Sequence, residues 1–363
     1  ANQDENLHFG LLTDFQDSDK ATLPEDEPLV QLACEKIEEL NKKYKGLQSD
    51  TFFLFHRPRQ WNPRERLWMG YERKRGKLEE LNSLLRGGSK NRFSLIIGKT
   101  EVLPSVKYVI TLDTDTQLPR DSARQLVGTM AHPLNRAHYN EKKHSVSSGY
   151  TILQPRVAIS LPGTNRSRYA KLYGSEPGID PYTRTVSDVY QDVFGEGSFI
   201  GKGIYDVDMF GRVLNGRFPE NRILSHDLIE GCHTRSGLLS DIELYEEYPH
   251  RYFTDVNRRH RWIRGDWQLL RWLLPVVPSP NNGLVRNHLS LLSLWKIFDN
   301  LRRSLSPLPL LLILLLGWTV LPQAWFWTLV VIGIILIPSL IISIVDLLNK
   351  SKDVLIRQHL VAA

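Results

Sequence analysis

Two aspartates, Asp113 and Asp115, have the residue type and spacing that most clearly suggest chemistry in this sequence. They follow the apolar, β-branched run 108–112, which predicts a buried strand. Alternate residues of a strand point to the same side, so both carboxylates could face one divalent cation. A cation held by Asp115 and assisted by Asp113, either Mg²⁺ or Mn²⁺, would neutralise a diphosphate. The alternative is a strand that ends in an ordinary turn, where aspartate is common.

The same two aspartates also fit part of a phosphatase pattern, Asp-x-Asp-x-Thr, in which the first aspartate is the nucleophile. Gln117 stands where this pattern has threonine. Such enzymes also need an acidic metal-binding pair further along the chain, and the candidate Gly265-Asp266 lies in a basic cluster instead. A phosphatase or phosphotransferase with Asp113 as nucleophile is therefore the alternative from a different class of enzyme.

Two clusters further along the chain add chemistry to this pair. The first contains His226 and Asp227 at the start of an expected helix, where Asp227 could simply be the helix N-cap. The second, at 258–268, interleaves several arginines with Trp262 and Trp267. So many cations beside tryptophans favour an anionic ligand such as a diphosphate, whereas a solvated basic face is the alternative.

The expected elements alternate between strands and helices. Strands are expected at 8–13, 52–57, 108–112 and 149–157, and helices at 29–44 and 77–85. This alternation predicts an α/β fold with a mainly parallel sheet flanked by helices. Ligands of such sheets bind at the carboxyl ends of the strands, where Asp14 and Asp113 both lie. Residues 160–192, rich in Gly, Pro and Tyr, are expected to form a long functional loop.

Composition narrows the class of ligand. The chain of 363 residues has 46 basic and 40 acidic residues, for a formal net charge of +6. Its basic clusters could bind nucleic acid or anionic lipid. No helix-turn-helix, zinc-finger or base-stacking signature is present, however, so we expect no nucleic-acid partner. Two cysteines are too few for a disulfide framework or a cysteine zinc site, which favours a reducing compartment.

The C-terminal part of the sequence is typical of a membrane protein. No charged residue occurs from 305 to 345, and Pro322-Gln323 divides this stretch in two. Each half approaches the roughly 17–25 residues that span a bilayer as a helix. Residues 305–346 are therefore expected to form a transmembrane helical hairpin, with a buried helical hairpin of a soluble protein as the alternative.

The expected organisation follows from this hairpin. Basic residues flank both of its ends but not its tip, so the soluble domain, 1–280, and the tail, 347–363, are predicted to be cytoplasmic. Between them, residues 284–303 have the apolar spacing of an amphipathic helix. This helix is expected to lie in the membrane interface, or else to pack on the soluble domain.

Three motifs in this order resemble those of processive, membrane-embedded family 2-type glycosyltransferases with the GT-A fold. They are Asp113-Thr114-Asp115, the aspartate Asp227 before a helix, and Arg258-x-x-Arg261-Trp262. The last motif usually begins with glutamine in this family, so Arg258 departs from it. Further similarity, at 53–58, 68–82 and 261–267, is to the cyclic β-1,2-glucan synthases, and the likeness extends over residues 6–274 and the expected spans.

This resemblance implies a catalytic fragment of a very large, multi-pass protein of the bacterial inner membrane. It implies UDP-glucose as donor, a growing β-1,2-glucan as acceptor, and inversion at the anomeric carbon. The expected partners are these substrates, membrane lipid and the remaining domains of the polypeptide. The alternatives are another membrane β-glycan synthase, which would make a linear β-glucan or a cellulose-like chain, and an inactive glucan-binding module.

The resemblance also assigns roles to residues. Asp227 would be the general base that takes the proton of the acceptor 2-hydroxyl, and Trp262 would stack on a sugar ring. Asp14 would contact the uridine. The other residues expected around the donor are Lys77, Asp113, Arg258, Arg261 and Arg264. The other residues expected around the acceptor are His226, Gly201 and Lys202.

Overall fold

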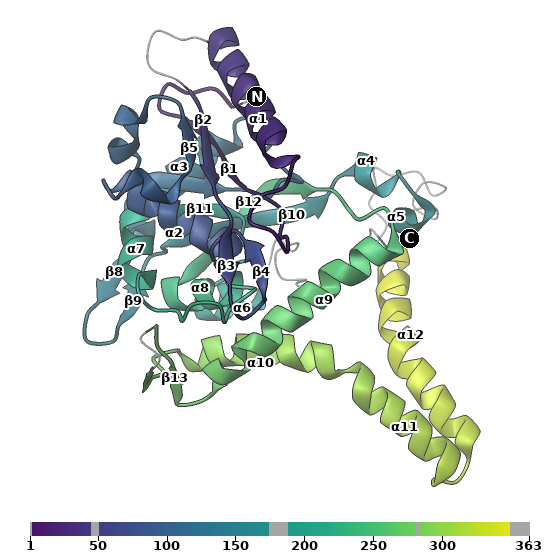
Figure 1. Ribbon diagram of the computed structural model, residues 1–363. Coiled ribbons are helices and arrows are strands. Elements are labelled where there is room, and N and C mark those ends of the chain that lie inside the picture. Colours follow the sequence, from purple (N-terminus) through teal and green to yellow (C-terminus); the bar gives the residue numbers. More distant parts are fainter. Residues whose placement is uncertain (1, 45–50, 174–187, 281–282, 349–363) are drawn as a thin grey trace. The chain divides into compact units, whose positions relative to one another are not determined.

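The computed structural model describes the chain except for residues 1, 45–50, 174–187, 281–282 and 349–363 (Figure 1). It has two compact units, Ala1–Asn300 and Leu301–Ala363, which are described separately. The first unit mixes helices with several sheets, and the second is helical. An α/β class is therefore confirmed for the first unit. The expected tail, 347–363, lies almost wholly outside the described residues.

The largest sheet has five strands and carries Asp113 near one strand end. Its order is β6 (Tyr108–Thr111), β11 (Gly203–Asp206), β10 (Ile152–Ile159), β12 (Ser236–Glu246) and β7 (Thr116–Gln117). Only β10 and β12 pair in parallel, whereas the other three neighbouring pairs are antiparallel. The expectation of a mainly parallel sheet is therefore wrong. The short strand β11 is inserted between β6 and β10, and its direction is not encoded in the alternation of its side chains.

A second sheet of three strands sets the position of Asp14. Strand β1 (Phe9–Asp14) pairs in parallel with β2 (Phe52–Arg57), and β5 (Leu95–Ile97) completes the sheet in antiparallel orientation. The register pairs Asp14 with Arg57 at the last position of both strands. Parallel strands need a crossover, which α1 (Asp26–Lys43) supplies.

Helix α3 (Ser122–Ala131) covers one face of the five-stranded sheet. Leu126 and Met130 of this helix form a buried cluster with one residue each from three strands, Leu153, Ile204 and Ile242. Burial of such side chains stabilises the fold by roughly 1.5–3 kcal/mol each before the entropy cost. The sheet that carries Asp113 is thus a rigid support for the site.

The remaining elements of the first unit are two longer helices, α2 (Arg73–Leu85) and α9 (Tyr252–Gln268), and several short helices and strands. Helix α2 follows the small ribbon of β3 (Gln60–Asn62) and β4 (Leu67–Met69). The others are η1 (Lys90–Arg92), η2 (Thr100–Ser105), η3 (Pro133–Asn135), β8 (His138–Asn140), β9 (Ser145–Ser148), α7 (Val207–Leu214), α8 (Asp227–Thr234), η4 (Leu269–Leu273), β13 (Val276–Pro278) and β14 (Leu284–Arg286).

The segment expected to be a long irregular loop, 160–192, is partly helical. It contains α4 (Leu161–Thr164) and α5 (Arg168–Tyr173), and α6 (Val189–Phe194) begins near its end. Residues 174–187 lie outside the described part. Asp188 caps α6 through a bond from the Tyr190 amide to Oδ1 (3.2 Å). This local N-cap supports the helix in a region whose Gly, Pro and Tyr content predicts a loop.

Helix α10 (Leu291–Leu305) begins later than the amphipathic helix expected at 284–303, because 284–286 pairs with β13 as strand β14. Its residues up to Asn300 belong to the first unit. There Trp295 Nε1 donates to Tyr190 Oη (3.0 Å) and Lys296 Nζ donates to the Gly197 carbonyl (2.8 Å). One side of this helix therefore packs on the rest of the first unit. A membrane contact of its exposed residues, such as Leu291, stays a prediction.

The second unit contains α11 (Pro307–Thr319) and α12 (Ala324–Leu348), which lie side by side (Figure 1). Trp318 Nε1 donates to Thr328 Oγ1 (2.9 Å), and Gly317 packs closely on Trp327. Among the described residues, one helical stretch, Leu291–Thr319, is long and apolar enough to cross a bilayer. The apolar stretch of α12 that the structure describes, Ala324–Pro338, is shorter. Two membrane spans within 305–346 therefore stay a prediction.

Candidate active site

Asp113 is held by two lysines just after β6. The strand ends at Thr111, and the amide of Thr116 donates to the Asp113 carbonyl (3.0 Å), so the aspartates lie in a turn. Lys74 Nζ donates to Oδ1 of Asp113 (2.5 Å), and Lys202 Nζ lies 3.1 Å from Oδ2. Burial alone would raise the pKa of Asp113, but the charges of Lys202 and Lys74 outweigh it and lower the pKa.

Asp115 differs from Asp113 in its surroundings. It is exposed in the turn and makes no ion pair with any residue that the structure describes. The argument that both aspartates face one side because strand residues alternate does not apply, since neither belongs to β6. The turn, rather than strand geometry, brings the two carboxylates into one short segment.

Lys202 is itself fixed by a second carboxylate. Its ammonium group forms an ion pair with Glu246 at the end of β12 as well as with Asp113. Burial would lower the pKa of Lys202, but these two carboxylates raise it above its usual value, so the lysine stays charged. Lys202, expected at the acceptor, therefore lies against Asp113, which was expected at the donor.

Gly201 connects Asp113 with Asp227. Its carbonyl accepts a bond from Lys74 Nζ (2.7 Å), the same group that binds Asp113. On its Cα, an added Cβ atom would lie 2.6 Å from Oδ1 of Asp227. The side chains of Asp113 in the turn after β6, Lys74 of α2 and Asp227 of α8, far apart in the sequence, thus lie around one glycine.

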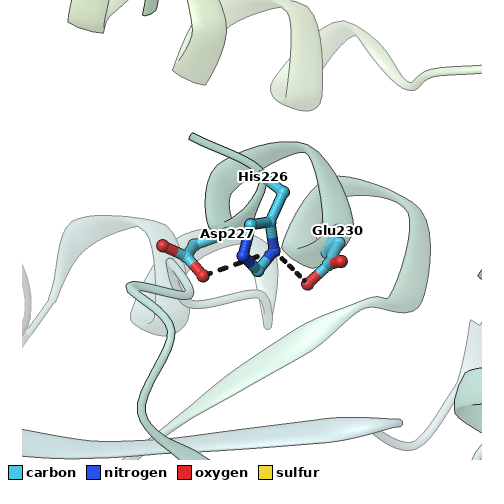
Figure 2. A group of neighbouring side chains, drawn as sticks. All are labelled: His226, Asp227 and Glu230. Atoms are coloured by element: carbon cyan, nitrogen blue, oxygen red, sulfur yellow. Dashed lines mark ion pairs between the residues drawn. The ribbon is translucent and has the colours of Figure 1, made fainter. Parts of the chain in front are cut away.

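Asp227 begins α8 beside a buried histidine (Figure 2). His226 occupies the N-cap position without making a side-chain capping bond, so Asp227 is not the cap. Nδ1 of His226 lies 3.0 Å from Oε2 of Glu230 and 3.6 Å from Oδ1 of Asp227. His226 and Glu230 are buried, whereas 27% of the Asp227 side chain is exposed. Asp227 is therefore the member of this group that a ligand can reach.

Asp14 is paired with a buried arginine at the end of β1. Nε and Nη2 of Arg57 donate to its two carboxylate oxygens (2.8 and 2.9 Å), and Nη1 donates to Glu80 (2.8 Å). Lys77 Nζ lies 3.7 Å from Oδ2 of Asp14. Lys77, expected at the diphosphate, thus contacts Asp14, and Lys74 contacts Asp113. The sequence argument missed Lys74, although residues three apart share a helix face.

The basic cluster of α9 is held by acidic residues of its own surroundings. Arg258 donates to Asp255 Oδ1 (2.8 Å) and lies over the Trp262 ring (4.7 Å), and Arg264 donates to Glu65 Oε1 (2.6 Å). Within the described ranges, none of these residues, nor the exposed Arg261, forms an ion pair or hydrogen bond with Asp113 or Asp227.

The end of α9 nevertheless reaches the segment before Asp227. Gly265 packs directly on Ser225, and Gln268 Oε1 accepts a bond from the Leu224 amide (2.6 Å). The helix that carries Arg261 and Trp262 is thus anchored beside α8. Of the expected site residues, Asp113, Gly201, Lys202, His226 and Asp227 lie together, and the α9 residues lie on the neighbouring helix.

Comparison with known proteins bears on this arrangement. No family model matches the chain. Over 363 residues it is 44% identical to the cyclic beta-(1,2)-glucan synthase NdvB of Rhizobium meliloti (strain 1021), an alignment that covers 99% of this chain. The chain spans only 12% of the length of that protein. The resemblance expected from the motifs is therefore confirmed: this chain is similar, over its whole length, to one segment of a cyclic β-(1,2)-glucan synthase.

Proposed function

We propose that this chain is the glucosyltransferase part of a cyclic β-1,2-glucan synthase. It would transfer glucose from UDP-glucose to the 2-hydroxyl of a growing β-1,2-glucan, processively and with inversion. The observation that carries this proposal is that Gly201 lies between the Lys74–Asp113 pair and the carboxylate of Asp227. The cationic surroundings of Asp113 suit an anionic donor, and the accessible carboxylate of Asp227 suits an acceptor hydroxyl.

The donor side would bind the diphosphate and the uridine. Lys74 and Lys202 place two ammonium groups at Asp113, and Asp115 offers an exposed carboxylate in the same turn. Carboxylate oxygens are the ligands that Mg²⁺ and Mn²⁺ prefer, so the two aspartates fit such an ion. A bound ion would neutralise charge that develops on the leaving UDP. Asp14, with Lys77 nearby, would face the uridine end.

The acceptor side would lie at Asp227. Its carboxylate would take the proton of the attacking hydroxyl, as a general base must be within hydrogen-bond reach of the proton that it removes. Trp262 would stack on a sugar of the glucan, and Arg258, Arg261 and Arg264 would approach the donor phosphates from α9. To bind the donor phosphates, Arg258 would have to leave Asp255 and Arg264 would have to leave Glu65.

The proposed setting is the bacterial inner membrane, within a larger polypeptide. The similarity to one segment of a much longer synthase supports further domains, and the apolar stretch Leu291–Thr319 supports membrane attachment. We place the soluble unit and the tail in the cytoplasm, with both halves of 305–346 spanning the bilayer. Cysteine labelling tests this: reaction of a cysteine at position 352 from outside intact cells would contradict it.

Linkage analysis of the product tests the proposed reaction. The full-length protein in membranes, supplied with UDP-glucose, should make a β-1,2-linked glucan, and a variant with Asp227→Asn should make it at a strongly reduced rate. A β-1,4 or β-1,3 product would instead identify another membrane β-glycan synthase. Fluoroberyllate trapped on Asp113, without UDP binding, would identify the aspartate-nucleophile alternative.

A further inference from the structure

Asp227 has two close neighbours that constrain its carboxylate. Gly201 lies against it, and the ring of His226 lies at Oδ1 (3.6 Å between Nδ1 and Oδ1). Oδ1 is buried and accepts no hydrogen bond from the described residues. Since 27% of the side chain is exposed, Oδ2 is the oxygen that faces a ligand.

The same ring nitrogen of His226, Nδ1, lies closer to Glu230 than to Asp227. The imidazole lies between the two carboxylates in the first turn of α8 (Figure 2), and Nδ1 is 3.0 Å from Oε2 of Glu230. Glu230 is buried and cannot reach a substrate. His226 is also buried, so it cannot contact the acceptor directly, as was expected of it. The pair therefore acts on the reaction only through Asp227.

The charges around His226 favour its protonated form. The groups that face it are Glu230 and Asp227 of α8 and Lys74 of α2. Burial and Lys74 lower the pKa of His226, but the two carboxylates outweigh them and raise it above its ordinary value. An imidazolium between two carboxylates leaves the group with one net negative charge, which is less costly to bury than two.

We propose that His226, held by Glu230, is a positioning residue that fixes Asp227 with Oδ1 turned inward and Oδ2 presented to the acceptor. This inference rests on the proposed function, in which Asp227 is the base. In the reaction the acceptor oxygen bonds to the anomeric carbon, UDP leaves with the electrons of the broken bond, and the hydroxyl proton passes to Oδ2. His226 keeps its own proton throughout, and Asp227 returns its proton to solvent.

The same three side chains could instead hold a metal ion. Their ligand atoms lie within 4.8 Å of one another, and histidine with two carboxylates is a common set of ligands. A metal ion and a proton compete for Nδ1 of His226, however. The experiment below therefore includes a metal-binding arm.

The test compares kcat as a function of pH for the full-length protein and its Glu230→Gln variant. Glu230 raises the pKa of His226, so removing this carboxylate should lower that pKa. The decline of kcat at high pH should therefore begin at a lower pH. At its optimum, kcat should fall roughly 10–100-fold, as expected for a misplaced catalytic group, with UDP affinity within about twofold. His226→Asn, which cannot be protonated, should lower kcat and lose this decline. Glu243→Gln, the same change on β12 away from the site, is the control and should match the wild type.

Three results would overturn the inference or its basis. An unshifted profile and unchanged kcat in Glu230→Gln, with Asp227→Asn strongly impaired, would remove the positioning role alone. Stoichiometric Mn²⁺ binding to an Asp113→Asn/Asp115→Asn variant, lost on adding Glu230→Gln, would show a metal site instead. Near-normal glucan synthesis by Asp227→Asn would remove the proposed base itself. Melting temperatures of each variant would separate these results from loss of folding.

Discussion

Gly201 lies directly against the carboxylate of Asp227, so that a Cβ atom at position 201 would come within 2.6 Å of Oδ1 and 3.0 Å of Oδ2. The φ angle of Gly201 is +89°, a region that residues with a side chain rarely adopt. Two features therefore favour glycine at this position: its backbone conformation and the lack of room beside the neighbouring carboxylate.

Substitution Gly201→Ala should displace Asp227 and lower kcat by about 10²-fold, since small misplacements of a reacting group are that costly. The donor KM should change less. Gly128→Ala is the matched control, because Gly128 lies in α3 with no atom within 4 Å of an added Cβ. It should retain activity and gain up to about 1 kcal/mol of stability. Steady-state kinetics and thermal melts measure both. A normal kcat in Gly201→Ala would contradict the close approach.

Lys74, rather than Lys77, is expected to control donor binding at Asp113. Lys74→Gln removes the ammonium group that contacts both Asp113 and the Gly201 carbonyl. Loss of one charge-assisted contact corresponds to about 1.5–3 kcal/mol, or roughly 10–150-fold weaker UDP binding. Lys77→Gln, three residues along the same helix, changes only the longer contact with Asp14 and should weaken binding less. Calorimetry with UDP and Mg²⁺ ranks the two variants. A larger loss of UDP affinity in Lys77→Gln than in Lys74→Gln would instead show that Lys77 binds the diphosphate.

UDP binding should depend on a divalent cation, because the exposed carboxylate of Asp115, which has no ion pair within the described residues, would repel a diphosphate. Asp115→Ala should abolish glucan synthesis and leave the melting temperature nearly unchanged, since this exposed side chain has no ion pair within the described residues. Titration of UDP with Mg²⁺, and again with EDTA, checks the first statement. Equal affinity in both would show that Lys74 and Lys202 alone bind the diphosphate.

The buried pair of Arg57 and Asp14 should matter for stability. Only 2% of the Arg57 side chain is exposed, and it also binds Glu80. Arg57→Met leaves Glu80 without its arginine and Asp14 with only the longer contact to Lys77, and breaking a buried pair on one side costs about 3–5 kcal/mol. Lys36→Met, which removes an exposed pair with Glu39, should cost no more than about 1 kcal/mol. Urea unfolding of both variants tests this contrast, and similar midpoints would contradict it.

The sequence predicted the elements with strong local signals. The strand at 52–57 and a helix start near Asp227 occur as expected, because an aromatic run and a short apolar lead-in specify them locally. The resemblance also assigned Asp113, Gly201 and Asp227 to one site; the structure places these residues close together, and their roles stay a prediction.

What the sequence did not predict depends on contacts between distant residues. The antiparallel insertion of β11 is a choice of pairing, which alternation leaves open. Lys74 and Lys77 are both near the start of α2, and only the packing of that helix decides which one meets Asp113. The contact between His226 and Glu230 follows helix spacing of four residues, a signal that was present but not used.

The last prediction separates catalysis from structure at Asp227. The residue begins α8 but does not cap it, so Asp227→Asn keeps the shape of the side chain at little cost in stability. Loss of a general base typically lowers the rate by about 10²–10⁴-fold. We therefore expect a folded variant that binds UDP normally and has a strongly reduced kcat, since a base acts mainly in the transition state. Calorimetry, melting curves and glucan assays on one preparation test the three parts. Near-normal synthesis would leave Asp227 with only a structural role, and the buried Glu230 could not replace it, because its oxygens lie beside His226 rather than at the exposed face of the site.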